Sequence, residues 1–539
     1  MKKILILLFI FGVSQLRAQE ISIIPKPTSL QLKEGNFSIT PKTKIALAGS
    51  NLDKIAALLQ SFIENKYGFK LPIVKNGAIK GNIVLNFDRL DHPFQGAYHL
   101  EVNSDHIYIG GDNEAGVFYA VQSLFQLLPI SKTSPITIQQ MVIDDSPRFE
   151  YRGLMLDVSR HFFSVSFIKK FIDFIAYHKM NKFHWHLTDD QGWRIEIKKY
   201  PKLTSVGAFR NGTLIGRYPG TGNTDKVYGG FYTQEEIKEI VKYAADRYVE
   251  VIPEIELPGH SSAAIAAYPE LSCFPLASTT YPAKTTWSGS TVGKQVQQIW
   301  GVHEDVFAPT EYTFTFLENV LNEVTKLFPS KYIHIGGDEC PKESWKKSAF
   351  CQQLIKDKNL KDEHALQSYF IQRIEKFINS KGKKLIGWDE ILEGGLAPNA
   401  TVMSWRGEKG GIEAAKQKHN VIMTPGEWVY FDHAQNNPED SITIGGYTNL
   451  QKVYSYEPIP KDLTKEEEKY VLGAQANLWT EYINNPSKAE YMLFPRLSAL
   501  CEILWSTKES RDWLNFQQRM QVQYKRYEWL NFNYNKPAK

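Results

Sequence analysis

The sequence predicts an α/β protein whose main body is a (β/α)8 TIM barrel, preceded by a small α+β domain and followed by a helical extension. Three observations support this prediction. The chain of 539 residues is longer than a usual single domain. Short apolar strands alternate with amphipathic helices from residue 149 onward, and eight such strands can be counted. We therefore divide the mature chain into residues 19–148, 149–507 and 508–539.

The first 18 residues have the pattern of a secretory signal peptide. Lys2-Lys3 precede the apolar run 4–13, and the small residue Ala18 stands at the expected cleavage point. The apolar run is too short to span a bilayer. We therefore expect residues 1–18 to be removed, which leaves an exported (periplasmic or secreted) protein without a membrane anchor.

Composition and charge narrow the classes of function. With 42% hydrophobic and 23% charged residues, the chain has the composition of an ordinary globular protein. The signal peptide carries three of the 63 basic residues and none of the 59 acidic ones, so the mature protein is nearly neutral. This balance gives no support to a nucleic-acid or acidic-surface partner. Cys273, Cys340, Cys351 and Cys501 have neither metal-ligand spacing nor the number of a disulfide scaffold, and their pairing stays open.

The α+β domain is predicted over residues 19–148. It contains short β-rich runs at 82–87, 98–102 and 106–109. An amphipathic helix is predicted over 113–128, because its apolar residues recur at helical spacing.

The barrel is predicted over residues 149–507. Its eight strand candidates are 153–156, 182–187, 250–253, 332–335, 384–387, 401–403, 421–423 and 472–475. A helix at 167–177 joins the first two, and Thr233 with Glu236 forms a capping box that opens the helix before the third. The step from the fifth to the sixth strand is too short for a full helix, so one unit should be degenerate. Residues 508–539 are expected to form a helical tail that packs on the barrel.

Acidic and aromatic side chains follow nearly every predicted strand. In a barrel of parallel strands these ends meet at one face, where catalytic sites lie. Acids interleaved with tryptophans suit a carbohydrate, because sugar C–H faces stack on aromatic rings, carboxylates and arginine bind hydroxyls, and glycosidic cleavage needs a carboxyl acid. In strand order the residues are Asp157, Arg160 and His161; His184, His186, Asp189 and Asp190; Glu254, Glu256 and His260; Asp338 and Glu339; Trp388, Asp389 and Glu390; Trp405; Tyr430 and Asp432; Trp479 and Glu481.

Asp338 and Glu339 are the candidate catalytic carboxyls. They are adjacent, so on an extended segment their side chains point in different directions and can serve different groups of the substrate. To act as an acid at neutral pH, Glu339 needs a raised pKa, and we expect nearby carboxylates to raise it. His260 and Asp189 are expected to hold and relay its proton.

Three motifs among these residues carry a family resemblance. The most specific is His334-Ile335-Gly336-Gly337-Asp338-Glu339, and segments 152–161 and 184–191 support it. The chain resembles the family 20 glycoside hydrolases, the β-N-acetylhexosaminidases, over nearly all of its mature length. One position departs from the family pattern: Glu256 stands where an Asp is expected before Pro258-Gly259-His260, which leaves the role of Glu256 open.

The resemblance implies an exo-acting, retaining β-N-acetylhexosaminidase that removes terminal N-acetylglucosamine or N-acetylgalactosamine without metal or cofactor. The implied mechanism is substrate-assisted: the 2-acetamido oxygen attacks the anomeric carbon and forms an oxazolinium ion. The resemblance implies that Glu339 is the acid and base, that Asp338 orients the acetamido group and that Tyr430 donates a hydrogen bond to the acetamido oxygen. It implies that His260 and Asp189 support the acid. The implied pocket walls are Trp388, Trp405 and Trp479, and the residues implied to bind sugar hydroxyls are Arg160, Asp432 and Glu481.

Three other hypotheses about the function are compatible with the sequence. A disaccharide-releasing member of the same family needs a wider pocket. A metal-dependent barrel hydrolase would use His184 and His186, which share one face of a strand, with His260 and Asp338 completing the site. A non-catalytic sugar-binding protein would keep the tryptophans but has no use for Glu339.

Several residues also have a purely structural interpretation. Trp185 suits packing between a helix and a strand, and His184 and His186 suit buried, hydrogen-bonded positions. The natural aglycone, the group that leaves with the glycosidic oxygen, depends on the long loops 205–230 and 274–310.

Overall fold

The computed structural model describes residues 21–537, and the expected signal peptide lies outside this range. Its N-terminal domain is a mixed seven-stranded sheet in the order β1-β7-β5-β6-β4-β2-β3. The antiparallel half pairs β1, β7, β5 and β6, and the parallel half pairs β6, β4, β2 and β3. The strands are β1 (Ser29–Ile39), β2 (Ile45–Leu47), β3 (Ile73–Lys75), β4 (Ile83–Phe87), β5 (Tyr98–Val102), β6 (Ile107–Gly111) and β7 (Ile136–Asp145).

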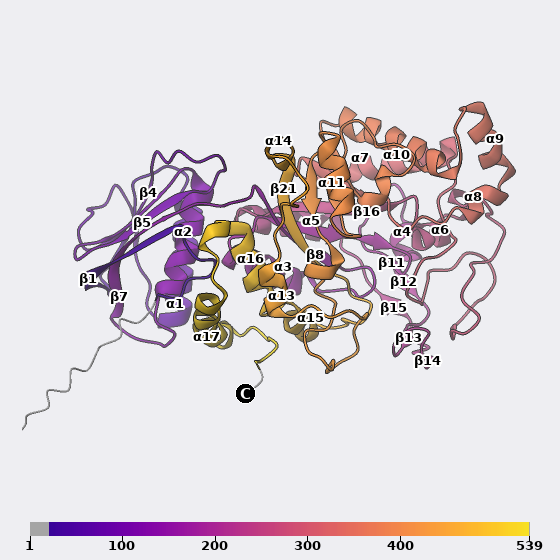
Figure 1. Cartoon of the computed structure of the whole chain (residues 1–539). Coiled ribbons are helices and arrows are strands. Elements are labelled where there is room, and N and C mark those ends of the chain that lie inside the picture. The colour runs from indigo at the N-terminus through magenta and orange to yellow at the C-terminus, as the bar shows by residue number, and fades with distance from the viewer. Residues whose placement is uncertain (1–20, 538–539) are drawn as a thin grey trace, which may run out of the picture.

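Two helices lie between this sheet and the rest of the molecule. They are α1 (Asp53–Tyr67) and α2 (Glu114–Leu127), and both stand on the side of the sheet that faces the barrel (Figure 1). Helix α2 is buried along most of its length and begins at Asn113, whose side chain accepts a hydrogen bond from Gly116 N. The helix predicted over 113–128 is therefore confirmed.

Eight parallel strands close into a barrel, so the predicted (β/α)8 fold is confirmed. Each predicted strand falls on one of the observed ones. In barrel order these are β8 (Tyr151–Asp157), β9 (Lys182–His186), β16 (Glu250–Leu257), β17 (Tyr332–Gly336), β18 (Lys384–Trp388), β19 (Thr401–Ser404), β20 (Val421–Met423) and β21 (Val471–Leu478). The barrel closes where β21 pairs with β8, from Gly473 beside Tyr151 to Leu478 beside Leu156.

Helices surround the barrel, with one unit reduced as expected. The main ones are α3 (Val165–Tyr177), α5 (Gln234–Ala245), α7 (Glu311–Leu327), α10 (Glu363–Ser380), α11 (Lys409–Lys416) and α16 (Arg496–Trp505). Between β18 and β19 stands only the 3-10 turn η2 (Asp389–Leu392). The capping box of α5 is present, because Glu236 N donates to Thr233 Oγ at 3.2 Å and Thr233 N donates to Glu236 Oε2 at 2.9 Å.

Shorter elements sit in the connections. They are β10 (Thr188–Asp189), β11 (Gly192–Trp193), α4 (Lys202–Ser205), β12 (Phe209–Arg210), β13 (Leu214–Ile215), β14 (Gly222–Asn223), β15 (Tyr228–Gly229), α6 (Ser262–Ala267), η1 (Pro269–Leu271), α8 (Glu343–Lys347), α9 (Ala349–Asp357), α12 (Gly426–Val429), α13 (Leu450–Ser455), α14 (Lys465–Glu468), α15 (Pro486–Leu493) and η3 (Lys508–Ser510). Most of them follow the carboxyl ends of barrel strands.

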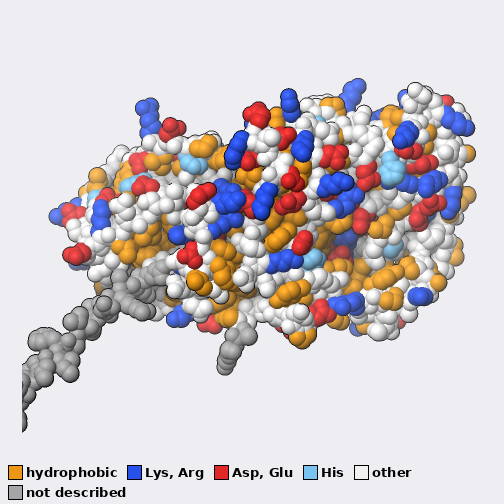
Figure 2. Space-filling view, viewed as in Figure 1, with side chains coloured by type: hydrophobic (Ala, Val, Ile, Leu, Met, Phe, Trp, Pro, Cys, Tyr) orange, Lys and Arg blue, Asp and Glu red, His pale blue; other side chains and the backbone are white. Residues whose placement is uncertain are grey.

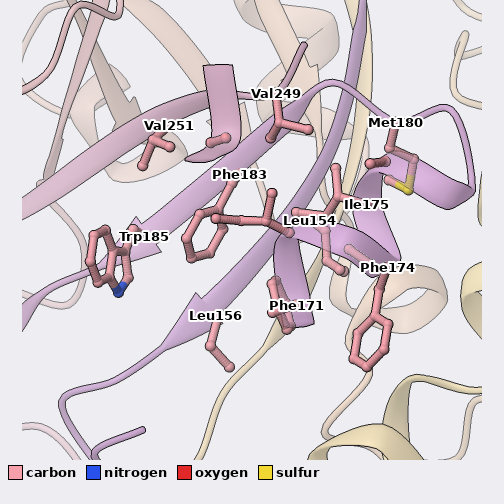
Figure 3. Close-up of a cluster of buried hydrophobic side chains, with 14 of the residues drawn as sticks. Leu154, Leu156, Phe171, Phe174, Ile175, Met180, Phe183, Trp185, Val249 and Val251 are labelled. Carbon is pink, nitrogen blue, oxygen red and sulfur yellow. The ribbon is translucent and has the colours of Figure 1, made fainter. Parts of the chain in front are cut away.

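Because side chains alternate along each barrel strand, one set points into the barrel and the other points out toward the surrounding helices. In β9, Phe183 and Trp185 point out of the barrel and join the apolar cluster of Figure 3, with the Phe183 ring 5.4 Å from that of Phe171 in α3. The intervening His184 and His186 point into the barrel, because successive side chains of a strand face opposite ways. Trp185 therefore packs on the outer side of β9, with its ring 4.8 Å from that of Tyr232.

The C-terminal helix α17 (Trp513–Leu530) packs on both domains rather than on the barrel alone. Its Arg526 donates to Gln126 O of α2 at 2.7 Å. Its Arg519 donates to Ile23 O at 2.9 Å and forms a buried ion pair with Glu502 of α16. The helical tail thus ties the sheet domain to the barrel (Figure 1).

Basic and acidic side chains are interspersed on the face of the molecule shown in Figure 2. That face therefore has no broad field of one sign. Within residues 21–537, no helix combines the length and apolar character that crossing a membrane requires.

Candidate active site

A cavity of about 680 Å³ opens at the carboxyl ends of the barrel strands. Every predicted site residue except Asp189 lines it. These lining residues are Arg160, His260, Asp338, Glu339, Trp388, Trp405, Tyr430, Asp432, Trp479 and Glu481. Side chains from seven of the eight strand ends therefore converge on one space, as expected for a site at this face of a barrel.

The turn after β17 presents Asp338 and Glu339 to the cavity. Gly336, Gly337 and Glu339 all have positive φ, at 66°, 89° and 41°. A Cβ atom at Gly336 would lie 1.7 Å from Glu256 Oε2, so only glycine fits there. The glycines of the motif are thus required by the backbone, and the strained φ of Glu339 marks a position where the turn is held for function.

His260 stands between the two carboxyls and a buried acidic pair. Its Nε2 lies 3.5 Å from Glu339 Oε2 and 3.6 Å from Asp338 Oδ2. Its Nδ1 is 3.0 Å from Asp190 Oδ2 and 3.4 Å from Asp189 Oδ1. Ser262 N and Ser262 Oγ also donate to Asp190, at 2.9 and 2.6 Å. Asp190 therefore makes the shorter contact with the imidazole, and Asp189, the carboxylate expected to support His260, faces the same nitrogen beside it.

Asp189 also anchors the arginine of the pocket. Its Oδ2 lies 2.9 Å from Arg160 Nη2 and 2.8 Å from His186 Nε2. Arg160 also contacts Asp157 Oδ2 at 3.2 Å, and its guanidinium lies 5.1 Å from the centre of the Trp479 ring. These contacts hold Arg160 in one orientation at the cavity wall, with Glu481 3.9 Å away.

The charges in this network set its protonation. Burial alone would lower the pKa of His260, but Asp189, Asp190 and Glu339 hold that pKa well above its ordinary value. The hydrogen bond from His260 then lowers the pKa of Glu339, which overturns our expectation of a raised value. The protonated imidazole of His260, 3.5 Å from Glu339 Oε2, outweighs the effect of the nearby carboxylates. Burial raises the pKa of Asp338 to about 7, and the charges of Glu254 and Glu339 act in the same direction.

Aromatic rings form the walls next to Asp338. Trp405 and Tyr430 stack at 6.2 Å between ring centres, and Trp388 lies 5.8 Å from Trp479. The indole nitrogens are fixed, because Trp388 Nε1 donates to Glu254 and Trp405 Nε1 donates to Glu390, both at 2.9 Å. Burial and the Asp338 charge raise the pKa of Glu390 to about 8. The tryptophans are therefore rigid surfaces rather than loose packing.

Three carboxyl oxygens of the cavity have no hydrogen-bond partner among the described residues. They belong to Asp338 (Oδ1), Asp432 (Oδ1) and Glu481 (Oε2). Burial raises the pKa of both Asp432 and Glu481. A buried polar atom without a partner costs free energy, so this arrangement fits a ligand that brings several hydrogen-bonding groups.

The histidines of β9 belong to the barrel interior and not to the cavity. Glu254 lies among three imidazoles, 2.9 Å from His184 Nε2 and 2.8 Å from His334 Nδ1, and it also bonds His186 Nδ1. All four side chains are fully buried. Although His184, Glu254 and His334 offer ligand atoms within 4.8 Å of one another, they are sealed below Trp388 and do not line the cavity. This geometry disfavours the metal-dependent interpretation, which needs His184 and His186 beside His260 and Asp338.

Strand β16 runs farther than predicted, to Leu257, which places Glu254 and Glu256 within the strand rather than in a loop after it. Glu256 is 2% exposed, and neither of its oxygens has a hydrogen-bond partner in the described part of the chain. Burial, together with the Asp338 and Glu254 charges, raises its pKa well above the ordinary value. Glu256 is therefore a buried carboxyl beneath the Gly336 turn that holds its proton more tightly than an ordinary glutamate does.

The outer part of the cavity comes from the two loops that we expected to meet the aglycone. Arg217 and Tyr218 come from the first, and Trp300 and His303 come from the second. Tyr482 completes this rim, and its hydroxyl accepts a hydrogen bond from Tyr218 N at 2.9 Å. The spacing of these residues carries no recognisable pattern, so the sequence indicated the loops but not the side chains.

A closed (β/α)8 barrel with a cavity of paired carboxylates and tryptophan walls defines the class of barrel glycoside hydrolases. Residues 149–508 match the family model described as "Glycosyl hydrolase family 20, catalytic domain", and residues 20–146 match "Glycosyl hydrolase family 20, domain 2". The chain belongs to glycosyl hydrolase family 20.

Similar proteins come from several bacteria. A beta-hexosaminidase of Porphyromonas gingivalis is 46% identical over 96% of this chain, which spans 64% of that relative's length. One from Akkermansia muciniphila is 33% identical over 81% of this chain and 85% of its own length. Among solved structures, the Vibrio harveyi exo beta-N-acetylglucosaminidase in complex with N-acetylglucosamine has a TM-score of 0.83 at 32% identity, covering 96% of this chain and 79% of that one.

Proposed function

We propose that this protein is an exo-acting, retaining β-N-acetylhexosaminidase that removes terminal N-acetylglucosamine or N-acetylgalactosamine from glycans. The observation that carries the proposal is Asp338, a buried carboxyl with one unpartnered oxygen, set among tryptophan walls and Tyr430. An N-acetyl group needs such a site: an acceptor for its N–H, a donor for its carbonyl oxygen and flat surfaces around its methyl group. The names of the relatives agree with this substrate class.

The reaction is proposed to use the substrate as its own nucleophile. The acetamido oxygen attacks the anomeric carbon while Glu339 protonates the leaving glycosidic oxygen, and an oxazolinium ion forms. Asp338 accepts the acetamido N–H and stabilises the positive charge that develops there. Tyr430 donates to the acetamido oxygen and aims it. Water, deprotonated by Glu339, then attacks the same carbon and the configuration is retained.

The lowered pKa of Glu339 fits this acid role through His260. In the open cavity the proton resides on His260, 3.5 Å from a Glu339 side chain that is 40% exposed. A bound sugar covers Glu339 and removes its water, which raises the pKa of the carboxyl. The proton then passes from His260 Nε2 to Glu339 and on to the leaving oxygen, while Asp190 keeps the imidazole in place.

Release of a single sugar is favoured over release of a disaccharide. Arg160 and Asp432 are buried, Glu481 is half-buried, and all three line the cavity. Their hydrogen-bonding groups suit the hydroxyls of a terminal residue, which supports the release of a single sugar. The outer loops remain available to the aglycone.

The decisive experiment compares hydrolysis of an aryl β-N-acetylglucosaminide with that of the matching aryl β-glucoside, each with and without a chelator. Strong, chelator-insensitive activity on the first and almost none on the second is expected, because the glucoside lacks the nucleophile. Similar rates on both would mean that a protein carboxylate attacks. Loss of activity with the chelator would restore the metal-dependent interpretation, and inactivity on both would favour a disaccharide-releasing or non-catalytic protein.

We also propose that the mature protein is exported, on the basis of the amino-terminal pattern of residues 1–18. Fractionation of expressing cells, followed by amino-terminal sequencing of the mature chain, tests this. Cleavage after Ala18 is the expected result, and an uncut cytoplasmic chain would overturn it.

A further inference from the structure

Two cysteines far apart in the sequence lie side by side in the fold. Cys273 and Cys351 are 78 positions apart, and their Sγ atoms are 3.7 Å from each other. Cys273 follows η1 at the beginning of the long loop 272–310, and Cys351 lies in the first turn of α9. Both are free thiols in this structure, Cys273 partly exposed and Cys351 fully buried.

Packing holds the two thiols together. They belong to a small apolar cluster that is separate from the main core and includes Val306, Trp345 and Leu366. In α9, Cys351 N donates to Ser348 Oγ, which caps the helix and fixes the position of the cysteine. A shift of under 2 Å between the sulfurs would reach the bond length of about 2 Å that a disulfide requires.

The loop that begins at Cys273 forms part of the cavity. Residues 300–303 line its outer half. The base of the loop is closed by a bridge between Ser272 and Phe307, and it rests on α8 through hydrogen bonds from Trp345 Nε1 to Phe307 O (3.0 Å) and from Ser344 Oγ to Glu304 O (2.9 Å). A covalent link at Cys273 would join this base to the helices that follow Glu339.

We propose that Cys273 and Cys351 form a disulfide bond when the protein meets a disulfide oxidant, and that this bond fastens the base of loop 272–310 to α9. The thiol–disulfide chemistry of an oxidising compartment supplies the oxidant, and oxidised glutathione supplies it in solution.

The exchange proceeds in two steps. The partly exposed Cys273 attacks oxidised glutathione, breaking its S–S bond, forming a mixed disulfide and releasing one glutathione thiol. Cys351 then attacks Cys273 Sγ, which forms the protein disulfide and releases the second glutathione thiol. Each cysteine loses one proton and one electron, and the two glutathione thiols carry both away.

The other two cysteines serve as internal controls. Cys501 lies in α16, buried in the main core, where its Sγ donates to Ser498 O. Cys340 belongs to the same small cluster as the pair, so it is the competitor against which the assignment must be tested.

The first experiment maps the bond in the full-length protein. The protein is incubated with oxidised glutathione, denatured, alkylated and digested without reductant. A linked peptide holding Cys273 and Cys351, with Cys340 and Cys501 alkylated, is expected, and Cys340→Ser should keep this link. Four alkylated cysteines, or a link to Cys340, would overturn the assignment.

The second experiment measures what the bond does. Reduction is expected to lower the Tm by about 3–5 °C and to speed proteolytic cleavage within 274–302. The Cys273→Ser variant should show the reduced behaviour with or without reductant, whereas Cys501→Ala should respond to reductant like the wild type. A mapped bond whose reduction changes neither the Tm nor the cleavage rate would refute the fastening of the loop. Both readouts are independent of the proposed hydrolase activity.

Discussion

The Asp190→Asn substitution tests the hydrogen-bonded chain behind Glu339. Asn has the shape of Asp, and its Oδ1 can keep the bonds from Ser262 N and Oγ. The atom facing His260 Nδ1, now 3.0 Å away, becomes an uncharged amide. The imidazole then loses the charge-assisted bond that orients it, and its pKa falls because an adjacent negative charge is gone.

The size of the effect follows from that one bond. A hydrogen bond to a charged group contributes about 1.5–3 kcal/mol. If the bond matters mainly while the proton moves toward the leaving group, kcat falls by about 10- to 150-fold. The KM should change little, because Asp190 does not line the cavity. Asp189→Asn is the matched comparison: Asp189 also holds Arg160 at 2.9 Å, so its loss should raise KM as well.

The assay is steady-state hydrolysis of an aryl β-N-acetylglucosaminide from pH 4 to 9, with circular dichroism to check folding. A weaker imidazolium lowers the pKa of Glu339 less. The pH at which kcat/KM falls on the alkaline side should therefore differ between the wild type and the Asp190→Asn variant. A folded variant that keeps more than half of the wild-type kcat would refute the orienting role of Asp190.

Three further outcomes are expected. Glu339→Gln should lower kcat by about 10³-fold or more while substrate still binds, because the side chain can neither donate nor accept the proton. Steady-state kinetics and equilibrium binding of the substrate to the variant check this. An unchanged rate would remove Glu339 from the acid role. Asp338→Asn should lower the rate on N-acetylated substrates far more than any residual rate on the aryl glucoside, and equal losses would contradict its pairing with the acetamido group. For stability, burial lowers the pKa of His178 to about 4. The unfolded chain therefore takes up a proton below pH 6.5 that the folded chain excludes, and stability is lost as the pH falls from there toward 4. Urea unfolding at pH 7 and pH 5 should show a loss about 1–2 kcal/mol larger for the wild type than for His178→Gln, and equal losses would contradict this.

The strand pattern was readable because each barrel strand is a short apolar run between polar turns. Phe183 and Trp185 face out of the barrel and pack in the apolar layer around it, and this alternation leaves a trace in the sequence. The end of β16 was missed because Glu254 and Glu256 look like loop residues. Their burial depends on three histidines from β9 and β17, which only the closed barrel brings together.

The sequence by itself determined the fold class, the strand ends that carry chemistry and the residues at those ends that line the inner cavity, because periodicity and motif spacing are properties of the chain. Tertiary structure alone decided which carboxylate orients His260, the sign of the Glu339 pKa shift and the neighbour of each cysteine. These depend on distances of 3–4 Å between side chains from different strands and loops. Electrostatic and covalent chemistry is set at that scale, and no spacing along a single chain specifies it.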